Sequence, residues 1–369
     1  MDCSTSTTPR RPNRLTIDRE RPAQQPDRNN DTLQGTGPLL IAGRDPARAA
    51  ALVRSLGPAG PPVEALAVDL DDPASLDRFA ARCRLVVNCA GPSYRVLDTV
   101  ARAALRRGAD YVDAAGDDPA AIRLRARCGW RDWLTAGRTA VLSAGALPGL
   151  SGLLPRALAA DTDHPVRLDA YLGGVAALTP AAAGDVLLSH GPEHGTPAAA
   201  WREGGVRPRT LEPRRGLSLT AFPQPVNAFP FLSTEAGRLA RALNIGEVHW
   251  YTVFGGDRLP EELAMAWALG STDPAALVTA AAEDVRRHGS WYGQEFHLWT
   301  GTTDGPPAHT LTLRADDSYE LSGLMTAATT RALLTGGIPP GVHFAADVLD
   351  PQETTAALSA DPAARIEIS

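Results

Sequence analysis

Residues 85–117 read LVVNCAGPSYRVLDTVARAALRRGADYVDAAGD, and this stretch predicts a strand, a tight loop, a helix and a second strand. Residues 85–87 form an apolar run without polar alternation, which is typical of a strand buried on both faces of a parallel sheet. Ser93 is a candidate helix cap, the apolar residues after it recur at helical spacing, and Gly108 ends the helix. Ligands of open α/β sheets lie outside the carboxyl ends of the strands. The loops after both strands are therefore either a functional edge or ordinary turns.

The length and composition indicate a globular protein of two domains, because the chain has 369 residues and 44% apolar side chains. The net charge of −6 means that the chain has no excess of basic residues of the kind that binds nucleic acid. No apolar run approaches the ~18 residues of a membrane span, and the first residues contain no apolar signal-peptide core. The four cysteines show no CxxC spacing. We therefore expect a reduced, cytoplasmic protein without membrane or nucleic-acid partners.

The absence of lysine excludes several kinds of chemistry. All 36 cationic residues of the chain are arginine. Schiff-base catalysis, attachment of pyridoxal phosphate, a P-loop lysine and a Tyr-x-x-x-Lys reductase pair are all ruled out, because each of them requires a lysine.

The order of predicted elements divides the chain into four parts. Residues 1–36 are polar and are expected to be a disordered tail. Residues 37–150 alternate strand and helix, which predicts an incomplete Rossmann-like parallel sheet. Asp45-Pro46 and Asp72-Pro73 are predicted helix starts within it. Residues 151–355 mix helices with antiparallel-looking strands and predict an α+β substrate or dimerisation domain. The last helix, 322–335, is a candidate to pack back on the first domain, and 356–369 is predicted to be a tail.

Arg44 follows the first predicted strand, where a Rossmann fold selects its dinucleotide. An arginine at this position accommodates the 2′-phosphate of NADP, so Arg44 beside the small Gly43 favours NADP, unless Arg44 is only a solvated turn residue. Asp69 ends the next strand, where it either binds the adenine region or faces water. Asn88 and Gly91-Pro92 would lie under the pyrophosphate or the nicotinamide end.

The usual phosphate loop is missing from the visible pattern. A dinucleotide fold starts with a strand, the G-x-G-x-x-G loop and a helix whose N-terminus holds the pyrophosphate. Upstream of Leu39 the sequence offers only Gly35-Thr36-Gly37, without an apolar strand before it. The sequence is therefore compatible both with a protein that binds a dinucleotide and with one that does not.

Several stretches together resemble the saccharopine dehydrogenase/reductase-like NAD(P)-binding family. In the first half these are LLIAGRDPARAAAL, VDLDDPASL, LVVNCAGP and GADYVDAAGD. In the second half they are GALPGLSGLLPRAL, PFLSTEAGRLARAL, VHWYTVFGG and GGIPPGVHFAADVLDP. The resemblance covers residues 38–355, and it departs from the family where the first strand and glycine-rich loop would stand.

The resemblance implies an NAD(P)-dependent oxidoreductase that makes or cleaves a C–N bond of a small metabolite through an imine. A homodimer is also expected, since the second half is a candidate dimerisation domain. The resemblance implies that Arg44 contacts the 2′-phosphate and that residues 88–92 form the dinucleotide loop. It also implies that residues 113–117 edge the catalytic cleft and that residues 145–151 line it. The candidate residues are Asp117, Tyr94 and Asp113 for catalysis; Arg44, Asp69, Asn88, Ala90, Gly91 and Pro92 for the cofactor NADP; and Gly149, Ser151 and Tyr171 for the substrate.

The sequence gives less support to a metal site or to a hydrolase. His190 and His194 are four residues apart, but Pro192 and neighbouring glycines deny them a helix, so no metal site is predicted. Ser151 does not stand in the G-x-S-x-G context of a hydrolase nucleophile. Two functions stay open, namely an NADP-dependent reductase and a degenerate family member that acts as a binding or structural subunit without a dinucleotide.

Overall fold

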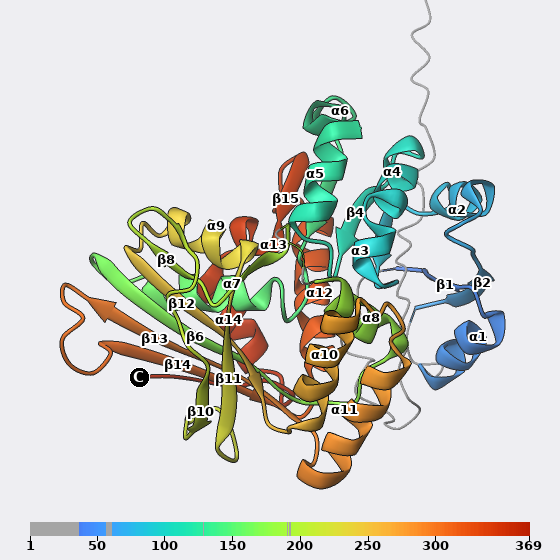
Figure 1. The fold of residues 1–369 in the computed structure, drawn as a ribbon. Helices are drawn as coiled ribbons and strands as arrows, with labels where there is room; N and C mark the ends of the chain where they lie inside the picture. Colours follow the sequence, from blue (N-terminus) through green and yellow to red (C-terminus); the bar gives the residue numbers. More distant parts are fainter. Residues whose placement is uncertain (1–36, 57–60, 128, 190, 192) are drawn as a thin grey trace, which may run out of the picture.

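The computed structural model describes residues 37–56, 61–127, 129–189, 191 and 193–369 (Figure 1). The N-terminal half contains β1 (Leu39–Gly43), α1 (Pro46–Ser55), β2 (Val63–Ala67), α2 (Pro73–Ala80), β3 (Leu85–Asn88), α3 (Ser93–Val96), α4 (Thr99–Arg106), β4 (Asp110–Asp113), α5 (Asp118–Arg127), α6 (Gly129–Thr135) and β5 (Thr139–Leu142). The predicted tail 1–36 lies outside the described residues.

The rest of the chain contains a longer mixture of helices and strands. These are α7 (Leu150–Ala159), β6 (Pro165–Val175), α8 (Pro180–Leu188), β7 (Gly195–Pro197), β8 (Ala200–Arg202), β9 (Gly205–Arg207), β10 (Arg214–Leu217), β11 (Val226–Ser233), α9 (Thr234–Ala242), β12 (Glu247–Phe254), α10 (Arg258–Leu269), α11 (Ala275–His288), β13 (Trp291–Thr300), β14 (His309–Ala315), α12 (Ser318–Leu334), β15 (Gly341–Phe344), α13 (Ala345–Val348), α14 (Pro351–Ser359) and β16 (Arg365–Ile368).

Local sequence rules account for the helix starts in the first half. The side chain of Asp45 accepts a hydrogen bond from the backbone N of Ala47 at 2.9 Å, and Asp72 does the same for Ala74 at 2.9 Å. A proline follows each cap, at the helical position where a missing N–H costs nothing. Both predicted helix starts are therefore confirmed.

The helix predicted after the 88–92 loop is interrupted. Leu97 has a φ of 50°, which ends α3 after four residues, and α4 begins at Thr99. Ser93 is also not the cap that the sequence predicts. Pro92 occupies the N-cap position without a side-chain bond, and the Ser93 hydroxyl donates instead to Asp185 at 2.9 Å. The sequence missed this because the competing acceptor lies on α8.

The fold is α/β with a Rossmann-like first part and a larger mixed sheet, as the sequence predicts. The parallel strands of the first part, however, form two sheets instead of one. Strands β1 and β2 pair with each other alone, and β3, β4, β5 and β15 form a second parallel sheet in the order β15-β5-β4-β3. In Figure 1 the β1–β2 pair lies at the opposite side of the molecule from β13 and β14.

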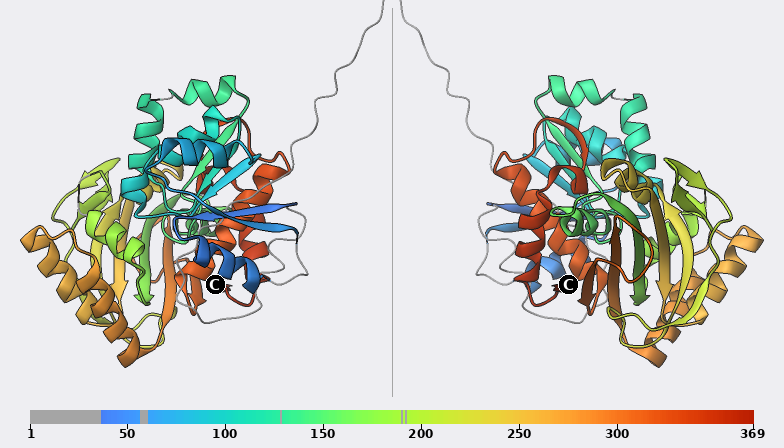
Figure 2. Two further views of the ribbon diagram at one scale, coloured as in Figure 1. Left: turned by 90° about the vertical axis from the view of Figure 1, so that its right-hand side faces the viewer. Right: turned by 90° about the vertical axis from the view of Figure 1, so that its left-hand side faces the viewer.

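The second part is built on a ten-stranded sheet whose main path is β10-β11-β12-β6-β13-β14-β16. Helices α7, α9 and α14 contact this sheet (Figures 1 and 2). One buried cluster contains Val87 and Val112 of the parallel sheet, Leu153 of α7, Met325 of α12 and Phe296 of β13. The two halves therefore share a continuous hydrophobic core.

The C-terminal segments return to both sheets. Helix α12 reaches the first part, because the Thr326 hydroxyl donates to the carbonyl of Ala144 at 2.7 Å. Strand β15 pairs in parallel with β5, so residues 341–344 extend the first part's sheet. Residues 356–369, which the sequence predicts to be a tail, hold the end of α14 and the strand β16 paired to β14. Within the described residues, none of the helices has the length and apolarity needed to cross a membrane.

Candidate active site

Arg44 and Asp69 follow β1 and β2, which are parallel neighbours, so both side chains lie at the same end of this small sheet. Both residues are exposed. Within the described residues the Arg44 side chain makes no ion pair, and Asp69 accepts only a turn bond from the backbone N of Asp71 at 3.0 Å. Both are available to a ligand on this side of the molecule.

Asp113, at the end of β4, is fully occupied by hydrogen bonds. Its Oδ1 accepts from the backbone N of Ala115 at 3.0 Å and of Gly116 at 2.7 Å. Its Oδ2 accepts from the Tyr111 hydroxyl at 2.5 Å and from Nδ2 of Asn88 at 3.2 Å. With 2% of its surface exposed, Asp113 organises the strand ends and has no free lone pair directed at solvent.

The loop after β3 is shaped by Asn88. The Nδ2 atom of Asn88 is used by Asp113, and Oδ1 accepts from the backbone N of Ala90 at 3.2 Å. Asn88 therefore acts on a ligand through the backbone of Ala90, Gly91 and Pro92 rather than through its own amide. A Cβ at Gly91 would lie 3.2 Å from Cβ of Ala181, so α8 sits directly on this loop.

Asp117, at the start of α5, is joined to α9 by a buried ion pair. Nη2 of Arg238 lies 2.9 Å from Oδ1 of Asp117, and the same guanidinium binds Asp118. The hydroxyls of Ser143 and Thr234 donate to Asp117 at 3.4 and 3.3 Å. The guanidinium also lies over the ring of Phe344, 3.7 Å from its centroid, so both ends of the pair are held in place.

Glu235, three residues before Arg238 on α9, holds the loop after β5. It accepts from the Ser151 hydroxyl at 2.5 Å and from the backbone N of Gly149 at 2.8 Å. Burial is the main cause that raises the pKa of Glu235, and the charge of Asp117 adds to it. A Cβ at Gly152 would lie 2.7 Å from Oε1 of Glu235, so a larger residue at this position of α7 would displace the Glu235 carboxylate. Gly149 and Ser151 are thereby fixed beside the Asp117 cluster.

Tyr94, in α3, lies among carboxylates. Burial raises the pKa of its hydroxyl, and the charges of Asp117, Asp185, Glu235 and Asp118 raise it further. The hydroxyl therefore stays protonated at physiological pH. The Tyr94 hydroxyl makes no hydrogen bond to any residue that the structure describes, so its full bonding capacity is available to a ligand.

Tyr171, predicted to contact the substrate, points away from this cluster. Successive side chains of β6 alternate between the faces of the sheet: Leu172 packs toward α7 in the shared core, whereas Tyr171 packs in a separate cluster with Tyr251. Its hydroxyl accepts from Arg214 at 2.5 Å. Tyr171 is thus separated from Gly149 and Ser151, because its side chain lies on the face of β6 opposite to the shared core.

Sequence reasoning missed Asp185, His194, Glu235 and Arg238. Asp185 is the only charge in the otherwise apolar helix PAAAGDVLL, and this was a signal that could have been used. Glu235 and Arg238 share one face of α9 with buried Ala236 and Leu239, but this is visible only once the helix is packed. Of the two histidines that the sequence analysis rejects as a metal site, His190 lies outside the described residues, and His194 packs on the Tyr94 ring.

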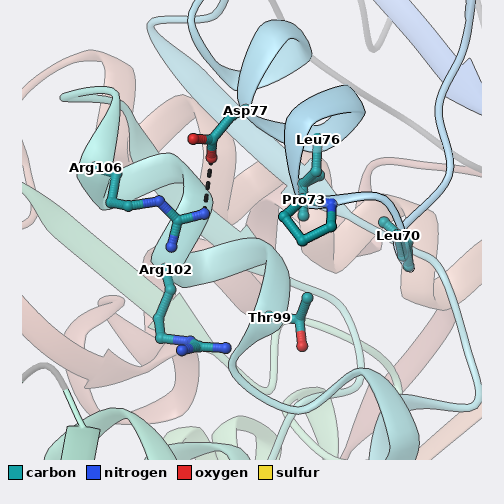
Figure 3. Close-up of a pocket in the computed structure, with 7 residues that line it drawn as sticks. All are labelled: Leu70, Pro73, Leu76, Asp77, Thr99, Arg102 and Arg106. Carbon is teal, nitrogen blue, oxygen red and sulfur yellow. Dashed lines mark hydrogen bonds and ion pairs between the residues drawn. The ribbon is translucent and has the colours of Figure 1, made fainter.

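A pocket of about 340 Å³ lies between α2 and α4 (Figure 3). It is lined by Leu70, Pro73, Leu76, Asp77, Thr99, Arg102 and Arg106. Arg106 pairs with Asp77 at 2.7 Å, and Nε of Arg102 lies 3.0 Å from Asp98. Because both guanidiniums already face a carboxylate, the pocket holds little free positive charge. One of its lining residues, Leu70, directly follows Asp69 in the sequence, so the pocket lies next to the end of β2.

The described residues suit the adenosine and nicotinamide ends of a dinucleotide but offer no loop for the pyrophosphate between them. Arg44 and Asp69 suit the adenosine ribose, and the 90–92 backbone suits the opposite end. The pyrophosphate loop of such folds follows a strand that separates the two halves of the sheet. Between residues 37 and 369, apart from the undescribed gaps, no strand pairs with the second edge of β1 or of β3. No pyrophosphate cradle is therefore present in this part of the chain.

Comparison with known proteins supports the family resemblance. Residues 27–141 match the family model described as saccharopine dehydrogenase NADP binding domain. A probable mitochondrial saccharopine dehydrogenase-like oxidoreductase of Arabidopsis thaliana is 33% identical over 91 residues, which are 24% of this chain and 20% of that relative. The chain thus matches only about a fifth of the length of this curated relative.

The fold as a whole is similar to that of a solved saccharopine dehydrogenase. The apo, histidine-tagged saccharopine dehydrogenase (L-Glu forming) of Saccharomyces cerevisiae aligns with a TM-score of 0.63 and 16% identity. The alignment covers 97% of this chain and 99% of the yeast chain. This likeness confirms the predicted fold class.

Proposed function

Because residues 27–141 match a saccharopine dehydrogenase NADP-binding domain, we propose that this chain is an NADP-dependent oxidoreductase. Its substrate would be a small metabolite whose C=N group accepts the hydride, or whose C–N bond is oxidised in the reverse direction. The structural observation that supports the C=N group is the set of acidic residues at the junction of the two halves, where Asp185 accepts from the backbone N of Tyr94 and Asp117 pairs with Arg238.

The cofactor NADPH, when bound, supplies the hydride. Arg44 would hold the 2′-phosphate, and Asp69 would hydrogen-bond the adenosine end. The backbone of Ala90, Gly91 and Pro92 would border the nicotinamide end. Asn88 would act by keeping that loop in shape, since Ala90 N donates to its Oδ1.

The charge of the site favours C=N over C=O as the reacting group. The charges of Asp117, Asp118 and Asp185 act on the Tyr94 hydroxyl, and Arg238 pairs with the first two of these carboxylates. A protonated imine carries a positive charge that such surroundings stabilise, while the alkoxide formed from a carbonyl would be repelled. Hydride addition to the protonated imine yields the neutral amine, so this step needs no additional proton.

Tyr94 would orient the substrate nitrogen. Its neutral hydroxyl has an oxygen lone pair that accepts a hydrogen bond from the N–H of a protonated imine. Asp113 and Asp117 would hold neighbouring groups in place rather than donate protons, because their carboxylates accept hydrogen bonds from protein groups. Gly149 and Ser151 would line the substrate side of the cluster.

A degenerate family member without a dinucleotide is the second candidate. The unpaired edges of β1 and β3 in the described residues favour it, because no phosphate cradle is formed there. Such a protein would retain the fold as a binding or structural subunit.

An absorbance assay separates the two candidates. Imines form reversibly from amines and carbonyl compounds in water, so NADPH oxidation is followed at ~340 nm with a panel of 2-oxo acids and aldehydes mixed with amines. The reductase predicts consumption of NADPH that depends on both partners, and Tyr94→Phe should slow it about tenfold or more. No consumption with any mixture, together with no binding of NADPH, leaves only the subunit hypothesis.

Three further expectations accompany this function. The division at residue 150 is the proposed domain boundary, although the halves share a core. A cytoplasmic location is proposed from the composition, and a homodimer from the candidate dimerisation domain in the second half. Light scattering on the purified chain tests the dimer, which predicts twice the chain mass of 38.8 kDa.

A further inference from the structure

Tyr94 lies in α3, a helix that is too short to fix its own orientation. Helix α3 has four residues, and its N-cap, Pro92, makes no side-chain capping bond. So short a helix has no independent stability in water. The positive φ of Leu97 then separates α3 from α4. The orientation of Tyr94 must therefore be set by other parts of the chain.

Asp185 of α8 caps α3 from a distance of ninety-one residues along the chain. One oxygen, Oδ1, accepts from the Ser93 hydroxyl at 2.9 Å and from the backbone N of Tyr94 at 3.2 Å. This is the task of an N-cap side chain, performed here by a residue of the second half.

The approach of α8 to this loop depends on small residues. A Cβ at Gly184 would lie 2.6 Å from Cγ of Pro92, and a Cβ at Gly91 would lie 3.2 Å from Ala181. Two glycines, one on each side, therefore allow α8 to come close enough for Asp185 to reach Tyr94.

His194 supports the ring of Tyr94. The two ring centroids are 4.0 Å apart at an interplanar angle of 47°. The backbone N of His194 donates to Gly191 at 3.0 Å, and its carbonyl accepts from the backbone N of Thr234 at 3.2 Å, next to α9. His194 is 7% exposed, so its ring has little freedom to move away.

We propose that Asp185 and His194 are positioning residues for Tyr94, the first through the backbone of α3 and the second through the aromatic ring. This inference rests on the proposed role of Tyr94 toward the substrate nitrogen. Its consequence is that the second half of the chain sets the geometry of a catalytic group carried by the first half.

The chain offers matched variants for both contacts. Asp185→Asn keeps an amide oxygen that can accept both bonds, whereas Asp185→Ala removes the acceptor. His194→Phe keeps a packed ring, whereas His194→Ala removes it. The proposal predicts that the first member of each pair keeps Tyr94 in its wild-type orientation and that the second does not.

The primary test needs no substrate. The full chain is labelled with 3-fluorotyrosine, and the Tyr94 resonance is assigned by its loss in Tyr94→Phe. We expect the ¹⁹F resonance of Tyr94 to shift toward the solvent-exposed value in Asp185→Ala and His194→Ala, and to stay in place in Asp185→Asn and His194→Phe. An unchanged resonance in both alanine variants overturns the proposal. If Asp185→Ala does not fold, His194→Ala decides the outcome alone.

Activity provides the second readout. With NADPH and a reactive imine mixture, both alanine variants should lower kcat about tenfold with less than about a twofold change in KM, and His194→Phe should restore it. Equal losses in His194→Ala and His194→Phe also overturn the proposal. A chain without any activity contradicts the proposed function instead, and the ¹⁹F result still reports whether Tyr94 is positioned as inferred.

Discussion

Nη2 of Arg238 lies 2.9 Å from Oδ1 of Asp117, and this ion pair joins α9 to the start of α5 across the junction of the two halves. Asp117 is 5% exposed, so loss of the guanidinium leaves a buried carboxylate without its cation. The pair therefore fixes both the junction and the charge of the candidate site.

Removing Arg238 should destabilise the fold strongly. Arg238→Gln is expected to lower the free energy of unfolding by about 3 kcal/mol, because an uncompensated buried charge remains. Urea unfolding measures the change. Arg48→Gln is the control, since Arg48 pairs with Asp45 at 3.6 Å on the exposed surface and should cost less than about 0.5 kcal/mol. Equal effects of the two substitutions would show that the junction pair is not an anchor.

Glu235 should make stability depend on pH. Burial raises its pKa above the ordinary value of 4.5, so the folded state binds this proton more tightly than the unfolded state. Stability from this group is then complete below the unfolded-state pKa and is lost as pH rises toward the folded-state pKa. Glu235→Gln imitates the neutral acid: its amide oxygen accepts from Gly149 N and its NH₂ donates to Ser151.

The measurement is the melting temperature of both proteins between about pH 5 and pH 8. The wild type should lose more stability than Glu235→Gln over this interval. Parallel curves for the two proteins would mean that Glu235 does not titrate there.

Gly149 should tolerate no side chain. Its φ is 125°, and an added Cβ would lie 2.2 Å from the carbonyl oxygen of Ser143. Gly149→Ala therefore combines backbone strain with a backbone clash, and we expect a loss of about 3 kcal/mol or more in unfolding free energy. Gly108→Ala is the control, because its φ is 65° and its Cβ would meet open space, so only about 1 kcal/mol is expected. A similar cost at both positions would contradict the tight contact at Gly149.

Arg44 should decide between NADPH and NADH. Loss of one charge-assisted phosphate contact corresponds to about a 10- to 100-fold weaker affinity for NADPH. Arg44→Gln should show this loss in fluorescence titrations and leave NADH binding unchanged. Arg54→Gln, an exposed arginine in the last turn of α1, should change neither affinity. If Arg44→Gln weakened the binding of NADPH and of NADH equally, Arg44 would not contact the 2′-phosphate.

Local rules of sequence predicted the parts of the fold that depend on near neighbours. Asp45 and Asp72 cap their helices because the acceptor and the N–H groups are two residues apart. The buried strand ending at Asn88 was visible from its uninterrupted apolar run. Leu97 was not foreseen as a break, because a leucine at positive φ contradicts its own local preference and is held there by surrounding structure.

Contacts between distant residues account for what the sequence could not predict. The bond from Ser151 to Glu235 spans 84 residues, and the bond from Arg238 to Asp117 spans 121. No local sequence pattern indicates such distant partners. The same reason explains Tyr171, whose strand was foreseen although the face on which it lies was not. It also explains β15 (Gly341–Phe344), which completes a sheet that begins with β3 at Leu85.

Calorimetric titration of the purified chain with NADPH tests the central claim most directly. The account predicts saturating binding at a single site, with weaker binding of NADH and a rise in melting temperature that follows the degree of saturation. Neither heat nor a change in melting temperature up to about 1 mM NADPH would contradict the claim that this chain is an NADP-dependent oxidoreductase.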